Sequence, residues 1–405
     1  MLNWHSSQFK STSKAHLSLS LKKRTVSALT FLLFAITPLF ALANESLIPS
    51  PPEINGSSYI LIDAHSGQVL MSKNEDSAIP PASLTKIMTS YVTEYEMEQG
   101  NISPDDLVPV SIKAWRKGGS KMYIKEGTKV KLSDLLKGII IQSGNDASIA
   151  VAEYIAGSED AFADLMNRHA ARLGMTTSHF MNATGWPADG HYSSAKDLAT
   201  LSRALIRDFP QHYSLYSERS FTYNGITQPN RNTLLSWNQN VDGIKTGHTE
   251  EAGYCLVASA QENGMRLISV VTGTSSDHAR ATESQKMLTY GFRFFETKLA
   301  YPANAQIQTS QVWKGAQDEV NLISNEPVYL TYPRGQFENI TQHVLVPEQL
   351  EAPIAAGSKV GTIEFKLGEE VIATTDLVAQ NSIEEGGFFS KLFDSIKLFF
   401  IGLFS

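Results

Sequence analysis

The chain has 405 residues and a formal net charge of −7, which is long enough for two or three domains with cores of their own. Its ordinary apolar and charged fractions exclude extensive disorder, and its acidic balance is a poor match for nucleic acid. Cys255 is the only cysteine, so an internal disulfide and a cysteine-rich metal site are both excluded.

Residues 1–43 have the layout of a cleavable secretory signal. A basic run at residues 22–24 precedes an apolar stretch at residues 26–42, which ends in the small-x-small pattern Ala41-Leu42-Ala43. The stretch is shorter than the roughly 20 residues of a membrane-spanning helix, and Pro38 interrupts it. We therefore expect cleavage after Ala43 and an exported protein, whose net charge becomes −12 because the signal carries five cations and no acid.

The next part, residues 44–298, is expected to be one catalytic domain that starts with a β-hairpin. Two β-rich runs, residues 59–63 and 68–71, flank a glycine-containing turn. Apolar residues then recur at helical spacing through the middle of the domain. The expected helices cover residues 87–95, 133–141, 146–155, 160–173 and 194–206.

Two strong strands end this domain, at residues 253–260 and 266–273. Asn263-Gly264 lies between them, a dipeptide typical of tight hairpins because both turn residues need positive φ. A helix at residues 281–295 follows. The order β, helical, β, helix predicts an α/β (α+β) domain in which helices flank one antiparallel sheet.

Beyond this domain the composition changes twice. Short β-branched runs alternate with prolines over residues 299–382, which predicts a small all-β domain. Residues 383–405 predict an amphipathic helix that lies in a membrane interface, with a helix docked on protein as the alternative. Its expected apolar face consists of Phe389, Leu392, Phe393, Ile396, Phe399, Phe400 and Leu403, with Lys391, Asp394 and Ser395 opposite.

Three short strings carry chemistry, and they occur in a fixed order. They are Ser83-Leu84-Thr85-Lys86, Ser143-Gly144-Asn145 and Lys245-Thr246-Gly247. Each alone has a plain structural interpretation, such as a helix-capping serine with a solvated lysine, a turn, or the end of a surface strand. All three in an exported chain favour an enzyme.

The first string suits a serine nucleophile. Residues three apart share a helix face, so Ser83 Oγ and Lys86 Nζ can meet. Ser83 needs a base to remove its proton, and Lys86 can serve once its amine is uncharged. Burial and the cation Lys245 are expected to lower the pKa of Lys86. Backbone N–H groups at the helix start and after Gly247 are candidates for an oxyanion hole.

The other two strings suit substrate binding. Ser143 can relay a proton to a leaving amine, and Asn145 can hydrogen-bond a substrate amide. Lys245 and Thr246 suit a substrate carboxylate. Gly247 lets a substrate backbone approach the strand closely.

The trio, with Asp in place of Gly144, is the pattern of active-site-serine β-lactamases and penicillin-binding proteins. From about Ile54 onward the chain resembles the D-alanyl-D-alanine carboxypeptidases among low-molecular-mass, class C penicillin-binding proteins, most of all the group numbered five and six in enterobacteria. The stretches that carry this resemblance are residues 81–86, 142–146, 241–249 and 288–295, together with the Phe-rich tail.

The resemblance implies a serine β-lactamase/transpeptidase-like catalytic domain, a small β-sandwich-like domain and a peripheral anchor on the periplasmic face of the inner membrane. It also implies an oxyanion hole from the N–H groups of Ser83 and His248, and a carboxylate contact from Arg280. One departure is Thr184, which stands where some relatives have a histidine before a glycine. No cofactor is expected. The isolated His169, His179 and His191 favour structural roles over metal binding.

The predicted reaction removes the terminal D-alanine from peptidoglycan pentapeptides through an acyl-enzyme on Ser83. β-Lactams are expected to inhibit it, and peptidoglycan maturation and cell shape are the expected roles. The alternatives are endopeptidase or transpeptidase action, a weak β-lactamase, and a largely structural wall-binding protein. Residues 182–200 contain no Glu, which disfavours a β-lactamase of class A. The sequence leaves a homo-oligomer open.

Overall fold

The structure, a computed structural model, describes residues 48–404, so the expected signal at residues 1–43 lies outside the described residues. The catalytic part is built on a five-stranded antiparallel sheet with the strand order β2-β1-β9-β8-β7. In that order the strands are Val69–Lys73, Ser58–Asp63, Met265–Thr274, Gly253–Glu262 and Val241–Thr249. The strand β7 is therefore an edge strand.

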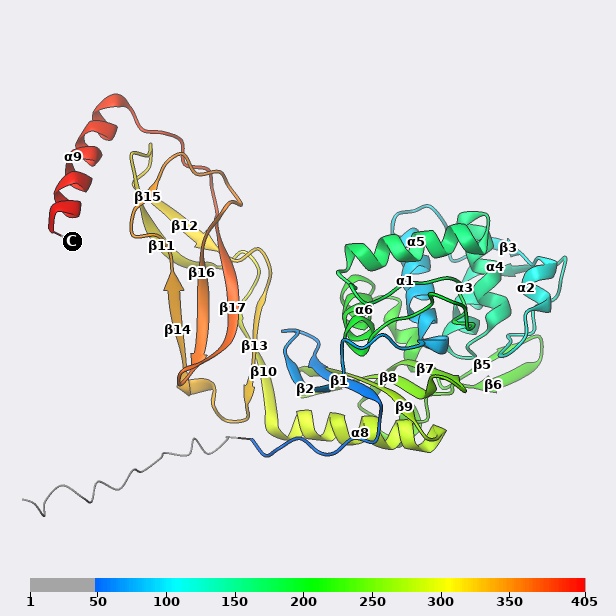
Figure 1. The fold of residues 1–405 in the computed structure, drawn as a ribbon. Coiled ribbons are helices and arrows are strands. Elements are labelled where there is room, and N and C mark those ends of the chain that lie inside the picture. Colours follow the sequence, from blue (N-terminus) through cyan, green and yellow to red (C-terminus); the bar gives the residue numbers. More distant parts are fainter. Residues whose placement is uncertain (1–47, 405) are drawn as a thin grey trace, which may run out of the picture. The chain divides into compact units, whose positions relative to one another are not determined.

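Helices cover both faces of this sheet (Figure 1). The helical layer on one face contains α1 (Thr85–Glu98), α3 (Leu132–Ile140), α4 (Asn145–Ala156), α5 (Glu159–Arg172) and α6 (Ala195–Asp208). The helix α8 (Asp277–Phe294) packs on the other face, against β8 and β9. The expected antiparallel sheet flanked by helices is confirmed.

The sequence pattern of β1 explains why both faces are covered. Ile60 and Ile62 join the core beneath α1 and α6, whereas Leu61 between them joins the core beneath α8. Successive side chains of a strand point to opposite faces, so an unbroken apolar run requires a cover on each side. The hairpin turn between β8 and β9 has positive φ at both Asn263 and Gly264, as expected.

One helix boundary differs from the expectation. α8 begins at Asp277 rather than at residue 281, because the Ser276 hydroxyl accepts a hydrogen bond from the backbone N–H of Ala279 and so caps the helix. Several short helices and strands were not predicted from the sequence. These are β3 (Leu107–Pro109), α2 (Ile112–Arg116), β4 (Lys129–Lys131), β5 (Ser220–Tyr223), β6 (Ile226–Pro229) and α7 (Leu234–Trp237).

The all-β part begins with β10 (Phe295–Tyr301), which contains the boundary expected at residue 298, and β10 pairs with β13 (Val328–Pro333). A six-stranded sheet has the order β14-β16-β17-β12-β11-β15. These strands are Ile340–Leu345, Lys359–Leu367, Glu370–Ala379, Glu319–Ile323, Gln306–Trp313 and Leu350–Glu351. Alternating residues such as Ile363 and Phe365 fill a separate core.

The chain ends in α9 (Phe388–Phe404), which leaves large apolar side chains in solvent. Phe388, Phe389 and Phe399 are 75%, 72% and 68% exposed. Within residues 48–404, no helix combines the length and the apolarity that crossing a membrane would require.

Candidate active site

All three strings contribute to one cleft with a volume of about 530 Å³. It is lined by Ser83, Ser120, Ser143, Pro229, Asn230, Arg231, Thr233, Thr246, Gly247, His248, Tyr254, Asp277 and Arg280. The three strings contribute from the turn before α1, the turn before α4 and the edge strand β7. The remaining lining residues come from the loop at Ser120, from residues 229–233, from β8 and from the start of α8. The structure therefore brings together side chains that lie far apart in the sequence.

Ser83 and Lys86 meet at the start of α1. Ser83 lies in a single 3-10 turn, Ala82–Leu84, and is half-buried beside the cleft. The amine of Lys86 is buried and donates a hydrogen bond to Ser83 Oγ at 3.2 Å. It also donates to Asn145 Oδ1 at 2.8 Å and to the backbone carbonyl of Thr184 at 2.5 Å. The nucleophile and its candidate base are thus in direct contact.

The pKa of Lys86 is lowered to about 7, mainly because the amine is buried. The positive charge of Arg231 contributes to this lowering, while the negative charge of Asp146 opposes it. Burial was expected to lower the pKa of Lys86 and is its largest cause, whereas the contribution of Arg231 was not expected. The pKa of Lys245 itself is held well below its usual value by burial and then by Lys86.

The second string forms the tight turn that starts α4. Ser143 has a φ of 60°, a conformation that residues other than glycine rarely adopt, and its buried Oγ has no hydrogen-bond partner among residues 48–404. The neighbouring Asp146 accepts hydrogen bonds from the backbone N–H groups of Met122, Tyr123 and Ile124 at 2.8–3.2 Å. This carboxylate fixes one rim of the cleft to the turn.

The edge strand β7 lies directly against the turn that holds Ser83. A Cβ on Gly247 would lie 3.1 Å from Leu84 Cγ and 3.2 Å from the carbonyl oxygen of Pro81, so a glycine permits this close approach. Lys245 Nζ donates to the carbonyl of Thr246 at 3.0 Å. Thr246 and Gly247 of this strand line the same cleft as Ser83 and Ser143.

Arg280 reaches the same wall from α8. Its guanidinium donates to the carbonyl of Gly247 at 3.2 Å and forms an ion pair with Asp277, one turn earlier. Tyr254 lies between two site residues: its ring centroid is 4.0 Å from that of His248 and 5.7 Å from the Arg280 guanidinium. The sequence reading missed Asp277 and Tyr254, because neither belongs to a string.

The loop with Thr184 also contacts the site, although not through a side chain acting on substrate. The Thr184 hydroxyl donates to Asn182 Oδ1 at 2.8 Å, and only its carbonyl accepts from Lys86. Gly185 has a φ of 79°, and a Cβ there would lie 1.7 Å from the carbonyl oxygen of Ala82. The loop is therefore pressed against the turn that carries Ser83.

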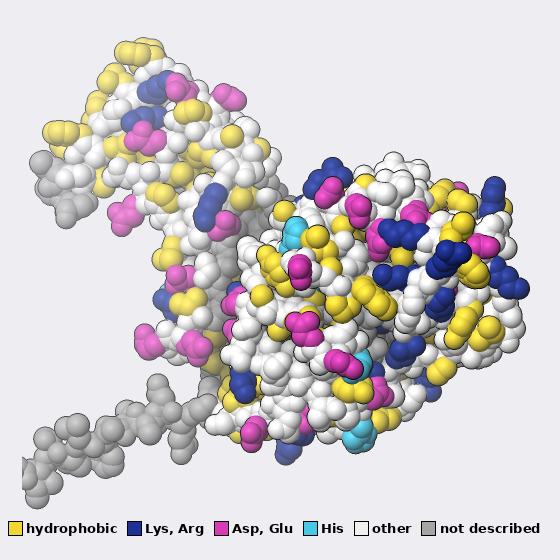
Figure 2. All heavy atoms as spheres, turned by 45° about the vertical axis from the view of Figure 1, so that its right-hand side comes forward, with side chains coloured by type: hydrophobic (Ala, Val, Ile, Leu, Met, Phe, Trp, Pro, Cys, Tyr) yellow, Lys and Arg dark blue, Asp and Glu magenta, His cyan; other side chains and the backbone are white. Residues whose placement is uncertain are grey.

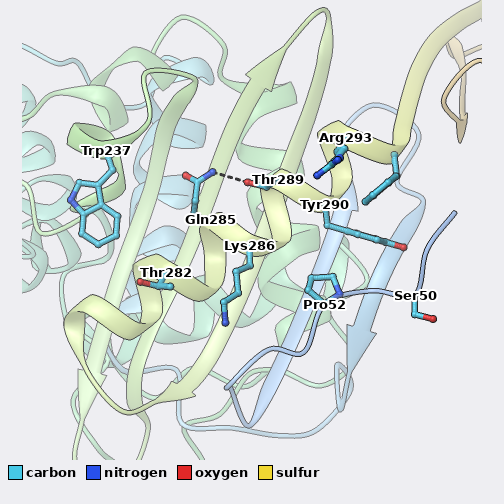
Figure 3. A pocket seen from close by; sticks show the side chains of 10 residues that line it. Ser50, Pro52, Trp237, Thr282, Gln285, Lys286, Thr289, Tyr290 and Arg293 are labelled. Carbon is cyan, nitrogen blue, oxygen red and sulfur yellow. Dashed lines mark hydrogen bonds between the residues drawn. The ribbon is translucent and has the colours of Figure 1, made fainter.

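A second cavity, of about 580 Å³, runs along the outer side of α8 (Figure 3). Trp237, Tyr290 and Phe294 give it an apolar wall, and Gln285 donates to Thr289 along its floor. None of the residues that line it belongs to the three strings. The smaller cleft contains Ser83, Ser143 and Thr246, so it is the better candidate for catalysis.

The three histidines that we expected to be structural have protein partners. His191 Nδ1 accepts from the N–H of Met181 at 3.0 Å, and its Nε2 lies 2.8 Å from Thr85 Oγ1. His169 Nδ1 contacts the Arg172 guanidinium at 3.0 Å, and His179 pairs with Tyr192 through the backbone. In the part of the chain from residue 48 to 404, no group of three or more acidic, Cys or His residues is arranged to hold a metal ion.

Two family patterns match this chain. The D-alanyl-D-alanine carboxypeptidase pattern, Peptidase S11, covers residues 45–276, and the C-terminal domain of penicillin-binding protein 5 covers residues 295–385. The chain belongs to the D-alanyl-D-alanine carboxypeptidase family. The expected family and the transpeptidase-like fold are confirmed.

Relatives in this carboxypeptidase family cover most of the chain. D-alanyl-D-alanine carboxypeptidase DacA of Escherichia coli strain K12 is 48% identical over 88% of this chain and 90% of its own length. DacC of the same strain is 45% identical over 93% of this chain and 96% of its own. The crystal structure of penicillin-binding protein 5 from Haemophilus influenzae matches with a TM-score of 0.81 at 40% identity, covering 83% of this chain and all of that one.

Proposed function

We propose that this chain is a serine-type carboxypeptidase that releases the terminal D-alanine from peptidoglycan pentapeptides, and that Ser83 forms the acyl-enzyme. The observation that carries the proposal is the 3.2 Å contact between Ser83 Oγ and the buried amine of Lys86, whose pKa is lowered to about 7. An uncharged amine at this position can accept the hydroxyl proton. Family membership supplies the reaction class.

Acylation follows from the geometry of the cleft. Ser83 Oγ attacks the carbonyl carbon between the two D-alanines while Lys86 Nζ takes the proton. The backbone N–H groups of Ser83 and His248 stabilise the oxyanion. Ser143, whose buried hydroxyl has no partner among the described residues, passes a proton to the leaving amine as the C–N bond breaks. D-Alanine departs, and the acyl group stays on Ser83 as an ester.

The substrate is held on both sides of the reacting carbonyl. Asn145 binds the peptide amide, while Thr246 and the Arg280 guanidinium bind the terminal carboxylate. A carboxylate placed there also raises the lowered pKa of Lys245. Water then attacks the ester, with Lys86 acting as base again, and frees the enzyme. β-Lactams acylate Ser83 by the same attack.

The test is the release of D-alanine from a synthetic pentapeptide, combined with mass spectrometry of the protein after labelling with penicillin. We expect D-alanine release and one long-lived adduct on Ser83. A wall-binding protein without catalysis would give neither result. A β-lactamase would hydrolyse the penicillin quickly and leave no adduct.

Asp277 is expected to weaken substrate binding, because its carboxylate occupies the guanidinium of Arg280 that the substrate carboxylate needs. Asp277 is 54% exposed, so the competing pair is worth little energy. D277N should therefore lower KM by roughly twofold to fivefold and leave kcat unchanged. Steady-state kinetics on the pentapeptide measure this, with D189N on the exposed loop as the control. A raised KM in D277N would contradict the competition.

We infer that the protein is exported and sits at the periplasmic face of the inner membrane, held there by α9. The apolar side of α9 is exposed, and its Asp394 carboxylate accepts a hydrogen bond from the backbone N–H of Lys314 at 2.7 Å. A helix whose polar side contacts protein leaves its aromatic side free for lipid. The basic and apolar start of the chain supports export.

Replacing three exposed phenylalanines of α9 is expected to release the full-length chain from membranes. F389S/F393S/F400S removes three rings that would each contribute about 1.5–3 kcal/mol on burial in lipid, so partition should fall by 100-fold or more. Flotation with phospholipid vesicles measures this. D394N, which alters the polar side, should still float. Vesicle binding by the triple variant equal to that of the unchanged chain would rule out α9 as the anchor.

A further inference from the structure

The segment from residue 111 to residue 131 is strongly basic, although the whole chain is acidic. It contains seven cations and one acid, Glu126, in a protein with a net charge of −7. The cations are Lys113, Arg116, Lys117, Lys121, Lys125, Lys129 and Lys131. We call this segment the basic excursion.

The basic excursion is compact, because the residues just before it pair with its last residues. The antiparallel strands β3 and β4 close its base, with Pro109 opposite Lys129. The N–H of Val110 donates to the carbonyl of Thr128, and the Lys121 amine donates to the carbonyl of Trp115 at 2.6 Å. Its positive charges are therefore held within one small region of the surface.

Several of these cations are not neutralised by the protein. Arg116, Lys125 and Lys129 are exposed, and none has a carboxylate partner among residues 48–404. In contrast, Lys113 and Lys131 pair with Glu159 and Asp105. Figure 2 shows Lys and Arg side chains gathered on the side of the catalytic part where α2 lies in Figure 1. Such a cluster attracts anions.

Aromatic side chains accompany the charges. Trp115 and Tyr123 of the basic excursion are 37% and 52% exposed, and Trp186 of the neighbouring loop is 45% exposed. The Lys117 amine lies 4.5 Å from the centre of the Trp186 ring. Exposed rings beside cations provide flat apolar contacts for a ligand that is only partly charged.

The basic excursion also forms one rim of the catalytic cleft. Its residue Ser120 lines the cleft, and the carbonyl of Gly118 accepts from the amide of Asn145 at 2.8 Å. A long ligand whose end enters the cleft beside Ser120 can therefore continue over the charged surface. A short ligand would remain inside the cleft.

We propose that the basic excursion binds the polymeric substrate next to the peptide that is being cleaved. This inference rests on the proposed carboxypeptidase function. Each uncleaved or cleaved peptide of the polymer ends in a free carboxylate, so a polymer with many such peptides is a polyanion. The cations hold neighbouring peptides of the same strand, and the rings pack on its apolar parts. The result is a higher local concentration of uncleaved ends at Ser83.

The experiment compares polymer and short peptide with the full-length chain in detergent. R116Q/K125Q/K129Q removes three exposed charges, and K73Q/R168Q/K298Q removes three exposed charges elsewhere as a matched control. The basic-excursion variant should bind sedimented peptidoglycan roughly tenfold to 100-fold more weakly at low salt, since each cation near a charged surface contributes a factor of about five. High salt should reduce this difference.

D-Alanine release from a short pentapeptide should be the same in both triple variants, because none of the substituted residues lines the cleft that holds this substrate. Equal polymer binding by the two variants would overturn the proposal while leaving the carboxypeptidase function intact. If the unchanged chain does not cleave the pentapeptide, the proposed carboxypeptidase function is wrong instead. If only binding to anionic lipid vesicles depends on the three cations, the surface faces the membrane and the polymer proposal is wrong.

Discussion

S83A is expected to lose D-alanine release by at least about 10³-fold and to form no covalent adduct with penicillin. Ser83 supplies the only hydroxyl that contacts the Lys86 amine within residues 48–404, at 3.2 Å. Without that oxygen the protein has no nucleophile to attack the substrate carbonyl. The oxyanion donors and the carboxylate contacts can then stabilise only the slow, direct attack of water on the substrate.

The control for S83A is S236A, which removes a hydroxyl from the exposed end of α7 outside the cleft lining. It should react like the unchanged chain. Thermal unfolding of S83A should be close to that of the parent, because within the described part of the chain Ser83 Oγ makes one hydrogen bond, to Lys86. A penicillin adduct that still forms in S83A would show that another residue is the nucleophile, and Ser143 would be the first candidate.

Much of the fold could be predicted from the sequence because local signals and burial agree. Asn263-Gly264 can adopt the two positive φ values that its turn requires, so the β8–β9 hairpin could be predicted from two residues. The start of α8 could not, because no apolar periodicity precedes residue 281 and the cap at Ser276 decides the boundary. The short strands β3 and β4 escaped because three residues are too few to show a period.

The candidate site, like the fold, could be predicted only in part from the sequence. Spacing along one helix correctly placed Lys86 beside Ser83, because residues three apart share a face. Burial as a cause of the lowered pKa of Lys86 could be predicted, whereas the contribution of Arg231 could not, since Arg231 approaches Lys86 only through tertiary folding. Asp277 escaped for a similar reason: it matters through Arg280, whose role came from a family resemblance.

Two backbone contacts make this site possible, and both involve glycine. Gly185 lets one loop press on Ala82, and Gly247 lets the edge strand approach Leu84. Together they clamp the turn that carries Ser83 from two sides. Ala82 itself has a φ of 48°, so the turn is held in a conformation that an isolated chain would rarely adopt. The surrounding packing thus fixes the nucleophile before substrate arrives.

The dependence of activity on pH is expected to show an acidic limb with an apparent pKa near 7. Below this pH Lys86 carries a proton and cannot accept one from Ser83, so kcat/KM should rise tenfold per pH unit. Above it the amine is neutral and the rate levels off. K86R should lack this limb and lose about 10²–10⁴-fold in activity, because a guanidinium stays charged.

The position of that limb should move when a neighbouring charge is removed. Lys117 lowers the pKa of Lys86 and does not line the cleft, so K117Q should raise this pKa and shift the limb to higher pH. K125Q, an equal change of charge on the exposed part of the same excursion, is the control and should shift it less, because solvent screens a charge that is exposed. A shift to lower pH in K117Q, or a profile that is flat across neutral pH, would contradict Lys86 as the base. An acidic limb that shifts to higher pH in K117Q alone would identify the titrating group as the Lys86 amine, which contacts Ser83.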